Sequence, residues 1–287
     1  MSDILDIRPS PIAGHWYSNN ALRLKNEIEG FIQGAPEEQT QRDVVGIFVP
    51  HAGYRYSGKT AGYAFRQILG LSFDVVVVFA PFHSYSPADI LTTAHGAYLT
   101  PLGAVQVAQG LVSSFLTAAQ QQTKNKFAKI ANDGEHSLEI ELPFLQVALS
   151  KPFALLPLMV RTITPHSARH LAHILADYLQ DSSVLLVAST DLSHFYPLEQ
   201  AEQLDQAMLT AIQSFSSEAV FQTEQTGNGY ACGLGAMLLA LETAKLLGAN
   251  IAKVLHHSTS AAETGDIRSV VGYGSGVFVR SSLTQAV

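Results

Sequence analysis

Short, continuous apolar runs alternate along the chain with longer segments in which apolar positions recur every three or four residues. Continuous runs rich in β-branched residues predict strands buried on both faces, as in a parallel sheet that helices cover. Strands are predicted near residues 45–50, 73–81, 154–160, 183–189, 251–257 and 270–279. Helices are predicted after residue 53 and near residues 21–32, 109–121, 164–179, 198–215 and 232–247. The pattern indicates an α/β fold with one domain over residues 1–287, built on a mixed, largely parallel sheet with helices on both faces.

Glycine, proline and capping residues refine these boundaries. Gly272, Gly274 and Gly276 are expected to break the last strand. A helix is expected to start within residues 133–137, which include good caps, and Pro143 should kink or restart it. Residues 34–42 are interpreted as a polar loop, and residues 100–103 as a turn.

Three predicted strands end in the same manner. The first stops at Pro50 and is followed by His51, and the second stops at Pro81 and is followed closely by His83. The third, ending at Ser189, leads into Asp191 and His194. In an open α/β sheet, ligands bind beyond the carboxyl ends of the strands, so these side chains are expected to share one crevice.

Two more segments could complete a site there. Glu135 and His136 lie on a predicted loop that could fold over the same edge, and Cys232 follows a glycine-rich turn at a predicted helix start. Such residues are typical ligands and proton carriers of a transition-metal site. Each also has a structural interpretation: Asp191 as a turn cap, Cys232 as a small buried hydrophobe, and Glu135 as an ordinary helix-start carboxylate.

Composition narrows the function classes. The chain has 287 residues, 47% of them hydrophobic, and a formal net charge of −7, which argues against nucleic acid or an anionic membrane as the main partner. It contains no apolar run long enough to span a bilayer, and its first residues lack the pattern of a signal peptide. A single cysteine excludes an internal disulfide. We therefore expect a cytoplasmic protein.

Beyond these patterns, the sequence resembles the Memo family, which includes a eukaryotic mediator of cell motility. The shared motifs run in order through nearly the whole chain: Trp16-Tyr17, Pro50-His51-Ala52-Gly53-Tyr54, Pro81 with His83, Thr100-Pro101-Leu102-Gly103, Glu135-His136-Ser137-Leu138-Glu139, Asp191 with His194, Cys232-Gly233 and Val271-Gly272-Tyr273. The resemblance implies a fold similar to class III extradiol dioxygenases, which are non-haem iron enzymes. It also implies that His51, His83 and Cys232 occupy the metal-binding positions, with Asp191 and His194 beside them. Prokaryotic members are encoded beside an AMMECR-type protein and a radical SAM protein, which implies a functional link to both.

Two departures from these families are visible. Phe82 and Ser84 flank a single histidine, His83, where the family usually has a small residue and paired histidines. Relative to the dioxygenases, a cysteine stands where a carboxylate would complete a triad of two histidines and one carboxylate.

The leading hypothesis is a cytoplasmic, dioxygenase-like oxidoreductase with one iron or copper ion, zinc being a further candidate. His51, His83 and Cys232 would hold the ion. His194 would be the general acid/base, with Asp191 orienting its ring, and His136 a second proton carrier.

Two alternatives remain. In one, the protein is a binding module that holds a small molecule or peptide in a cleft near Trp16 and Tyr54. In the other, the metal assists hydrolysis without redox chemistry. An enzyme needs an open coordination position and a buried pocket, whereas a binding module needs an exposed apolar patch.

Overall fold

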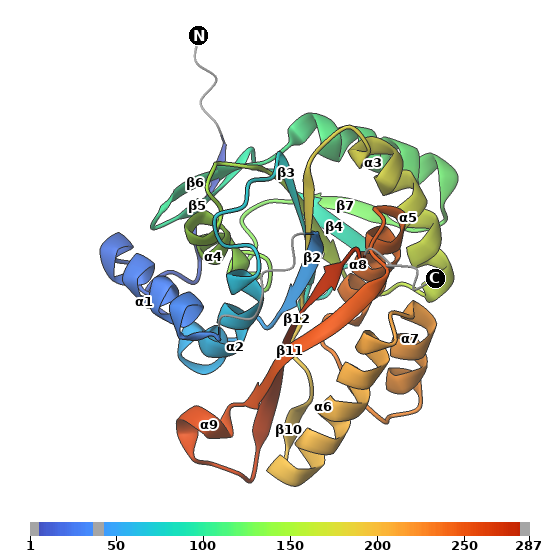
Figure 1. Ribbon diagram of the computed structural model, residues 1–287. Coiled ribbons are helices and arrows are strands. Elements are labelled where there is room, and N and C mark those ends of the chain that lie inside the picture. Colours follow the sequence, from blue (N-terminus) through green and yellow to red (C-terminus); the bar gives the residue numbers. More distant parts are fainter. Residues whose placement is uncertain (1–5, 37–42, 282–287) are drawn as a thin grey trace, which may run out of the picture.

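A computed structural model describes residues 6–36 and 43–281 of the chain. In this described part, a nine-stranded sheet has the order β10-β12-β2-β9-β3-β8-β4-β7, with β11 paired to β12 (Figure 1). Its strands are β2 (Val44–Val49), β3 (Val75–Pro81), β4 (Ile90–Thr93), β7 (Phe127–Ile130), β8 (Ala154–Val160), β9 (Val184–Ser189), β10 (His194–Tyr196), β11 (Ile251–Thr259) and β12 (Val270–Val279).

The centre of the sheet is parallel. Strand β9 pairs in parallel with β2 on one side and β3 on the other, and β8 extends the parallel set. The strands β2 and β3 are buried at every position, and β9 at all but its first, so both faces of this centre are covered. Antiparallel pairs join β12 to β2 and β4 to β8. The predicted mixed, largely parallel α/β sheet is confirmed.

Helices cover both faces of the sheet (Figure 1). The helices α1 (Ala21–Gly34), α2 (Tyr54–Arg66) and α4 (Glu141–Ala148) pack together on one side. On the other side lie α3 (Gln109–Gln122), α5 (Pro165–Leu179) and α8 (Leu234–Leu246). The helix α6 (Leu198–Gln213) packs on β11 and β12 and is followed by α7 (Ser217–Gln225), while the short α9 (Ala261–Thr264) joins β11 to β12.

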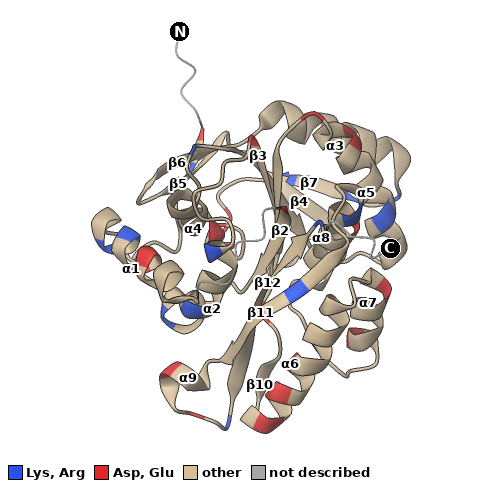
Figure 2. Ribbon diagram, viewed as in Figure 1, with Lys and Arg blue, Asp and Glu red and all other residues tan. Residues whose placement is uncertain are grey.

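Charge is distributed unevenly over these elements. Figure 2 shows Lys and Arg on α1 and α2, whereas α6 and α7 carry acidic side chains alone. In the described part of the chain, none of the helices has both the length and the apolar character required to cross a bilayer.

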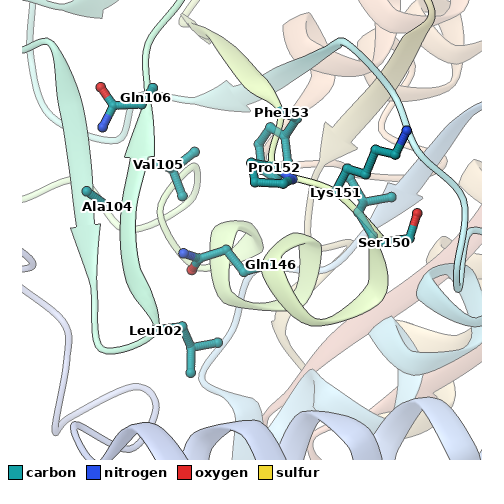
Figure 3. A pocket seen from close by; sticks show the side chains of 10 residues that line it. Leu102, Ala104, Val105, Gln106, Gln146, Ser150, Lys151, Pro152 and Phe153 are labelled. Carbon is teal, nitrogen blue, oxygen red and sulfur yellow. The ribbon is translucent and has the colours of Figure 1, made fainter.

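A separate three-stranded sheet packs beside the main one. It consists of β1 (Ile7–Arg8), β5 (Ala97–Thr100) and β6 (Gly103–Gln106), and the sequence patterns did not predict its strands. The turn expected at 100–103 is confirmed, and Gly103 adopts a positive φ of 119° there. A pocket of about 390 Å³ lies between this hairpin and the segment after α4 (Figure 3), and none of the candidate site residues lines it.

Three boundary predictions are wrong. The strand β12 runs unbroken through its glycines, because each lets a neighbour approach the backbone: a Cβ on Gly272 would overlap the Asp205 carboxylate, and one on Gly276 would overlap the Phe48 ring. The helix expected from 133–137 begins only at Glu141, and the one expected from 232 begins at Leu234. The loop expected at 34–42 lies largely outside the described residues.

The packing of α1 on α2 gives a test of the fold. A Cβ on Gly62 in α2 would overlap the carbonyl oxygen of Phe31 in α1, whereas a Cβ on Gly30 would meet nothing within 4 Å. We expect Gly62→Ala to lower the free energy of unfolding by about 1–3 kcal/mol through overpacking. Gly30→Ala should raise it by roughly 0.5–1 kcal/mol, because alanine favours the helix. Urea unfolding measures both; equal effects would contradict the close contact.

Candidate metal centre

Three histidines converge beyond the carboxyl ends of the central strands. His51 follows β2, His83 follows β3, and His136 comes from the loop before α4. One ring nitrogen from each lies within 4.8 Å of the other two. The His83 and His136 rings are stacked with centroids 4.9 Å apart, and His51 stands edge-on to both. The prediction that two strand ends and the 135–136 loop meet at one crevice is confirmed.

Glu135 holds His83 in place. Its carboxylate accepts the backbone N–H of His83 (2.6 Å) and faces the ring Nδ1 of His83 (2.9 Å). It also accepts the backbone N–H groups of His136 and Ser137. Burial alone would raise the pKa of Glu135, but these hydrogen bonds hold it well below its usual range, and Glu135 in turn raises the pKa of His83. An ionised carboxylate on Nδ1 leaves Nε2 of His83 for a ligand.

A buried arginine fixes the loop that carries Glu135. Arg8 of β1 is 2% exposed and pairs with Asp133 (2.8 Å) and Glu139 (2.5 Å). It also donates to the carbonyl oxygen of Glu135 (2.8 Å). The small sheet thus anchors the loop through charge-assisted hydrogen bonds. Glu135, which the sequence also allowed as an ordinary helix-start carboxylate, is buried and holds the loop, and Glu139 is buried against Arg8.

Ser189 sets the orientation of the His51 ring. Its hydroxyl donates to the carbonyl oxygen of Ser137 (2.8 Å) and lies 2.9 Å from Nδ1 of His51. Because a hydroxyl has one proton and the carbonyl can only accept it, we infer that Nδ1 of His51 is the donor toward Ser189. Glu141 also contacts Ser189 as an acceptor of its hydroxyl, and burial raises the pKa of Glu141 well above its usual range. The Nε2 atom of His51 is then a lone-pair donor.

Cys232 lies against that nitrogen. Its Sγ is 3.1 Å from Nε2 of His51 and accepts the backbone N–H of Asp191 at 3.2 Å. The next residue, Gly233, has no space for a side chain against the Ser189 carbonyl, which lets the loop approach β9. Burial and the nearby Asp191 raise the pKa of the Cys232 thiol. A bound cation would shift this thiol toward its thiolate form.

Asp191 and His194 are neighbours but are not paired as predicted. Asp191 Oδ1 accepts the backbone N–H of His51 (2.8 Å), and burial raises the pKa of Asp191 to about 7. The ring Nδ1 of His194 instead donates to the carbonyl oxygen of Leu192 (2.9 Å). The expected orientation of His194 by Asp191 is therefore wrong, because the carboxylate binds the backbone of His51 in the turn after β2. Burial lowers the pKa of His194, which leaves it neutral with Nε2 as a base.

A residue that sequence reasoning missed supports the His194 segment. Asp205 of α6 is fully buried; it accepts the backbone N–H of Ser193 (2.9 Å) and contacts Nε2 of His257 (2.8 Å). Gly272 leaves the space that this carboxylate fills and hydrogen-bonds to the carbonyl oxygen of Ser193. A carboxylate in a helix interior gives no periodic signal, and only Gly272, opposite it in the fold, marked the close approach.

Aromatic side chains border the histidines. The Trp16 ring lies 4.1 Å from the His136 ring and is 36% exposed, so it covers the cluster from the solvent side. Tyr54 is 3% exposed and donates to the carbonyl oxygen of Ile140, which places it in the core. Burial lowers the pKa of His136 to about 4, so this histidine is neutral at pH 7.

A small cavity opens beside Cys232. It has a volume of about 280 Å³, and both Cys232 and His194 line it together with Tyr196, Glu224 and Tyr230. Burial raises the pKa of Glu224, and the backbone N–H of Ala231 partly offsets that effect. Through this cavity a small molecule can reach the side chains of Cys232 and His194.

The fold and the site define an α/β protein with a cluster of histidines at the ends of parallel strands. The chain belongs to the Memo family, whose family model, described as "Memo-like protein", matches residues 8–277. A MEMO1 family protein of Nitrosopumilus maritimus is 30% identical over 277 residues, covering 95% of this chain and all of the relative. MEMO1 family proteins of Aquifex aeolicus and Methanobrevibacter smithii are each 30% identical, covering 95% of this chain and 99% of the relative.

The role of Glu135 can be tested by substitution. Glu135→Gln removes the charge that fixes the His83 tautomer, and we expect affinity for Zn²⁺ or Co²⁺ to fall about 10–100-fold. Asp133→Asn is the matched control, because it disturbs the same loop through Arg8 without contacting a histidine. Isothermal titration of the two variants measures the difference. Equal affinities in both would show that Glu135 acts on loop structure alone.

Proposed function

We propose that this Memo-family chain is a transition-metal-dependent redox protein with a single ion. The observation that carries this proposal is the convergence of three imidazole nitrogens within 4.8 Å, with Cys232 Sγ 3.1 Å from one of their rings. His51, His83 and Cys232 hold the ion, and His136 and His194 lie beside it. This assignment follows the positions that the family resemblance implies.

The donor set fits such an ion. Hydrogen bonds to Glu135 and Ser189 occupy the Nδ1 atoms of His83 and His51, so both rings offer Nε2. Imidazole and thiolate donors favour iron, copper or zinc over magnesium or calcium. Burial raises the pKa of Cys232, because no positive charge compensates a buried thiolate. A bound ion would supply that charge, so ion binding and deprotonation of Cys232 would favour each other.

The side chains around the ion would handle protons and exclude water. A bound iron or copper ion would supply one-electron chemistry and polarise a substrate. His194, neutral and with Nε2 free, accepts a proton from a substrate in the cavity beside Cys232. His136 is also neutral and can carry a second proton, while Trp16 shields its ring from bulk water.

One observation favours a second candidate function, a binding module without turnover. Two aromatic side chains near the centre are solvent-accessible: Trp16, which lies on His136, and Phe195, which follows His194 and is 74% exposed. Exposed aromatic surface of this kind is used to bind peptides or other proteins. Turnover with loss of activity in His194→Ala would exclude this alternative.

Single substitutions test the ligand assignment. His51→Ala and His83→Ala should abolish binding of one equivalent of metal, and Cys232→Ser should lower affinity for soft metals at least about tenfold while the fold survives. His136→Gln and His194→Ala should keep most of the metal. Metal content after anaerobic purification, measured together with thermal unfolding of apo and loaded protein, checks each variant.

Two results would contradict the assignment. Equal metal affinity in Cys232→Ser and the unsubstituted protein would make the cysteine a packed thiol. Loss of metal in His136→Gln as complete as in His51→Ala would make His136 the third ligand, in line with its place in the three-histidine group.

A further inference from the structure

The cavity beside Cys232 and His194 has a one-sided charge. Its lining contains one carboxylate, Glu224, and neither Lys nor Arg. Glu224 Oε2 accepts the backbone N–H of Ala231 (3.0 Å), and in the described part of the chain no hydrogen bond engages its other oxygen. An anionic ligand would meet this carboxylate without a counter-charge, which costs binding energy.

Two tyrosines line the same cavity as this carboxylate. The rings of Tyr196 and Tyr230 line the cavity and are stacked, with centroids 5.9 Å apart and an interplanar angle of 13°. The faces of aromatic rings attract cations through their quadrupole, and a carboxylate beside them adds a charge-assisted hydrogen bond. Carboxylate and aromatic faces together form the chemistry that recognises an ammonium group.

The helices α6 and α7 carry acidic charge alone. No Lys or Arg occurs between Arg169 and Lys245, and the acidic residues of this stretch that are not buried are Asp177, Asp181, Glu199, Glu202, Glu218 and Glu224. An open groove of about 910 Å³, lined by residues of α6 and of the α7 region, includes Glu199 and Glu202. A surface of one sign concentrates counter-ions and steers them toward a cleft.

We propose that the cavity lined by Tyr196, Glu224 and Tyr230 binds the ammonium group of a small organic cation and holds the rest of that molecule beside Cys232 and His194. The proposal rests on the proposed function, because it names the substrate class of the same centre. The volume of about 280 Å³ limits the ligand to a small amine or to a lysine side chain of a larger one.

The single cysteine provides a charge-sensitive probe of this cavity in metal-free protein. A methanethiosulfonate reagent reacts when the Cys232 thiolate attacks its sulfenyl sulfur, forming a mixed disulfide and releasing methanesulfinate. We compare the cationic 2-aminoethyl reagent with the anionic 2-sulfonatoethyl reagent, each relative to its rate with free cysteine. The cation-to-anion ratio should exceed that of free cysteine about tenfold.

Two matched variants assign the effect to one carboxylate. Glu224→Gln should lower the ratio about fivefold, because it removes the charge while its amide oxygen still accepts the Ala231 N–H. Glu218→Gln, on the same helix but exposed and outside the cavity, should leave the ratio unchanged. A ratio equal to that of free cysteine, or equal effects of the two substitutions, would overturn the proposal.

Competition identifies the ligand chemistry. n-Butylammonium should slow the reaction of Cys232 with neutral methyl methanethiosulfonate, and butyrate of the same size should not. Protection by Nα-acetyl-lysinamide but not by n-butylammonium would assign the ammonium group to a peptide. Protection by neither, or by butyrate, would refute a cation site. All these rates are measured without metal, so they are independent of whether the ion binds.

Discussion

The parallel pairing of β9 with both β2 and β3 is the constraint on which the centre depends. Val49 pairs with Ser189, and Phe79 lies opposite Ala188, so the three strands end within two residues of the same level. Pro50 directly follows β2, and Pro81 is the last residue of β3. The chain leaves the sheet after each proline, and His51 and His83 lie in the turns that follow. A shift of one residue in either register would turn alternate side chains to the opposite face and separate the two rings.

Hydrogen bonds beyond the histidines decide what these rings can do. Glu135 on one side and Ser189 on the other occupy the Nδ1 atoms of His83 and His51, which directs both Nε2 atoms to a common space. Arg8 and Asp205 act one step further out, on the 133–139 loop and on the segment before His194. The supporting carboxylates are therefore as important to the chemistry as the rings that would touch an ion.

The sequence predicted those parts whose cause is local. Continuous β-branched runs that end in proline were sufficient to place β2, β3 and their histidines, and Thr164-Pro165 was sufficient to start α5. It could not predict the small sheet of short strands, or that Asp191 would bind the His51 N–H rather than orient His194, because partners far apart in the chain decide both. The glycines of β12 were misread for the same reason: Phe48 and Asp205, which occupy the space they leave, are remote in sequence.

X-ray absorption at the zinc edge of protein loaded with one equivalent of Zn²⁺ identifies the atoms that bind the ion. Zinc has no redox chemistry, so the spectrum reports the donor atoms alone. We expect imidazole nitrogens at about 2.0–2.1 Å and one sulfur at about 2.3 Å, and we expect the sulfur to be lost in Cys232→Ser. A spectrum without imidazole scattering, or one that lacks sulfur in the unsubstituted protein, would contradict a centre built on His51, His83 and Cys232.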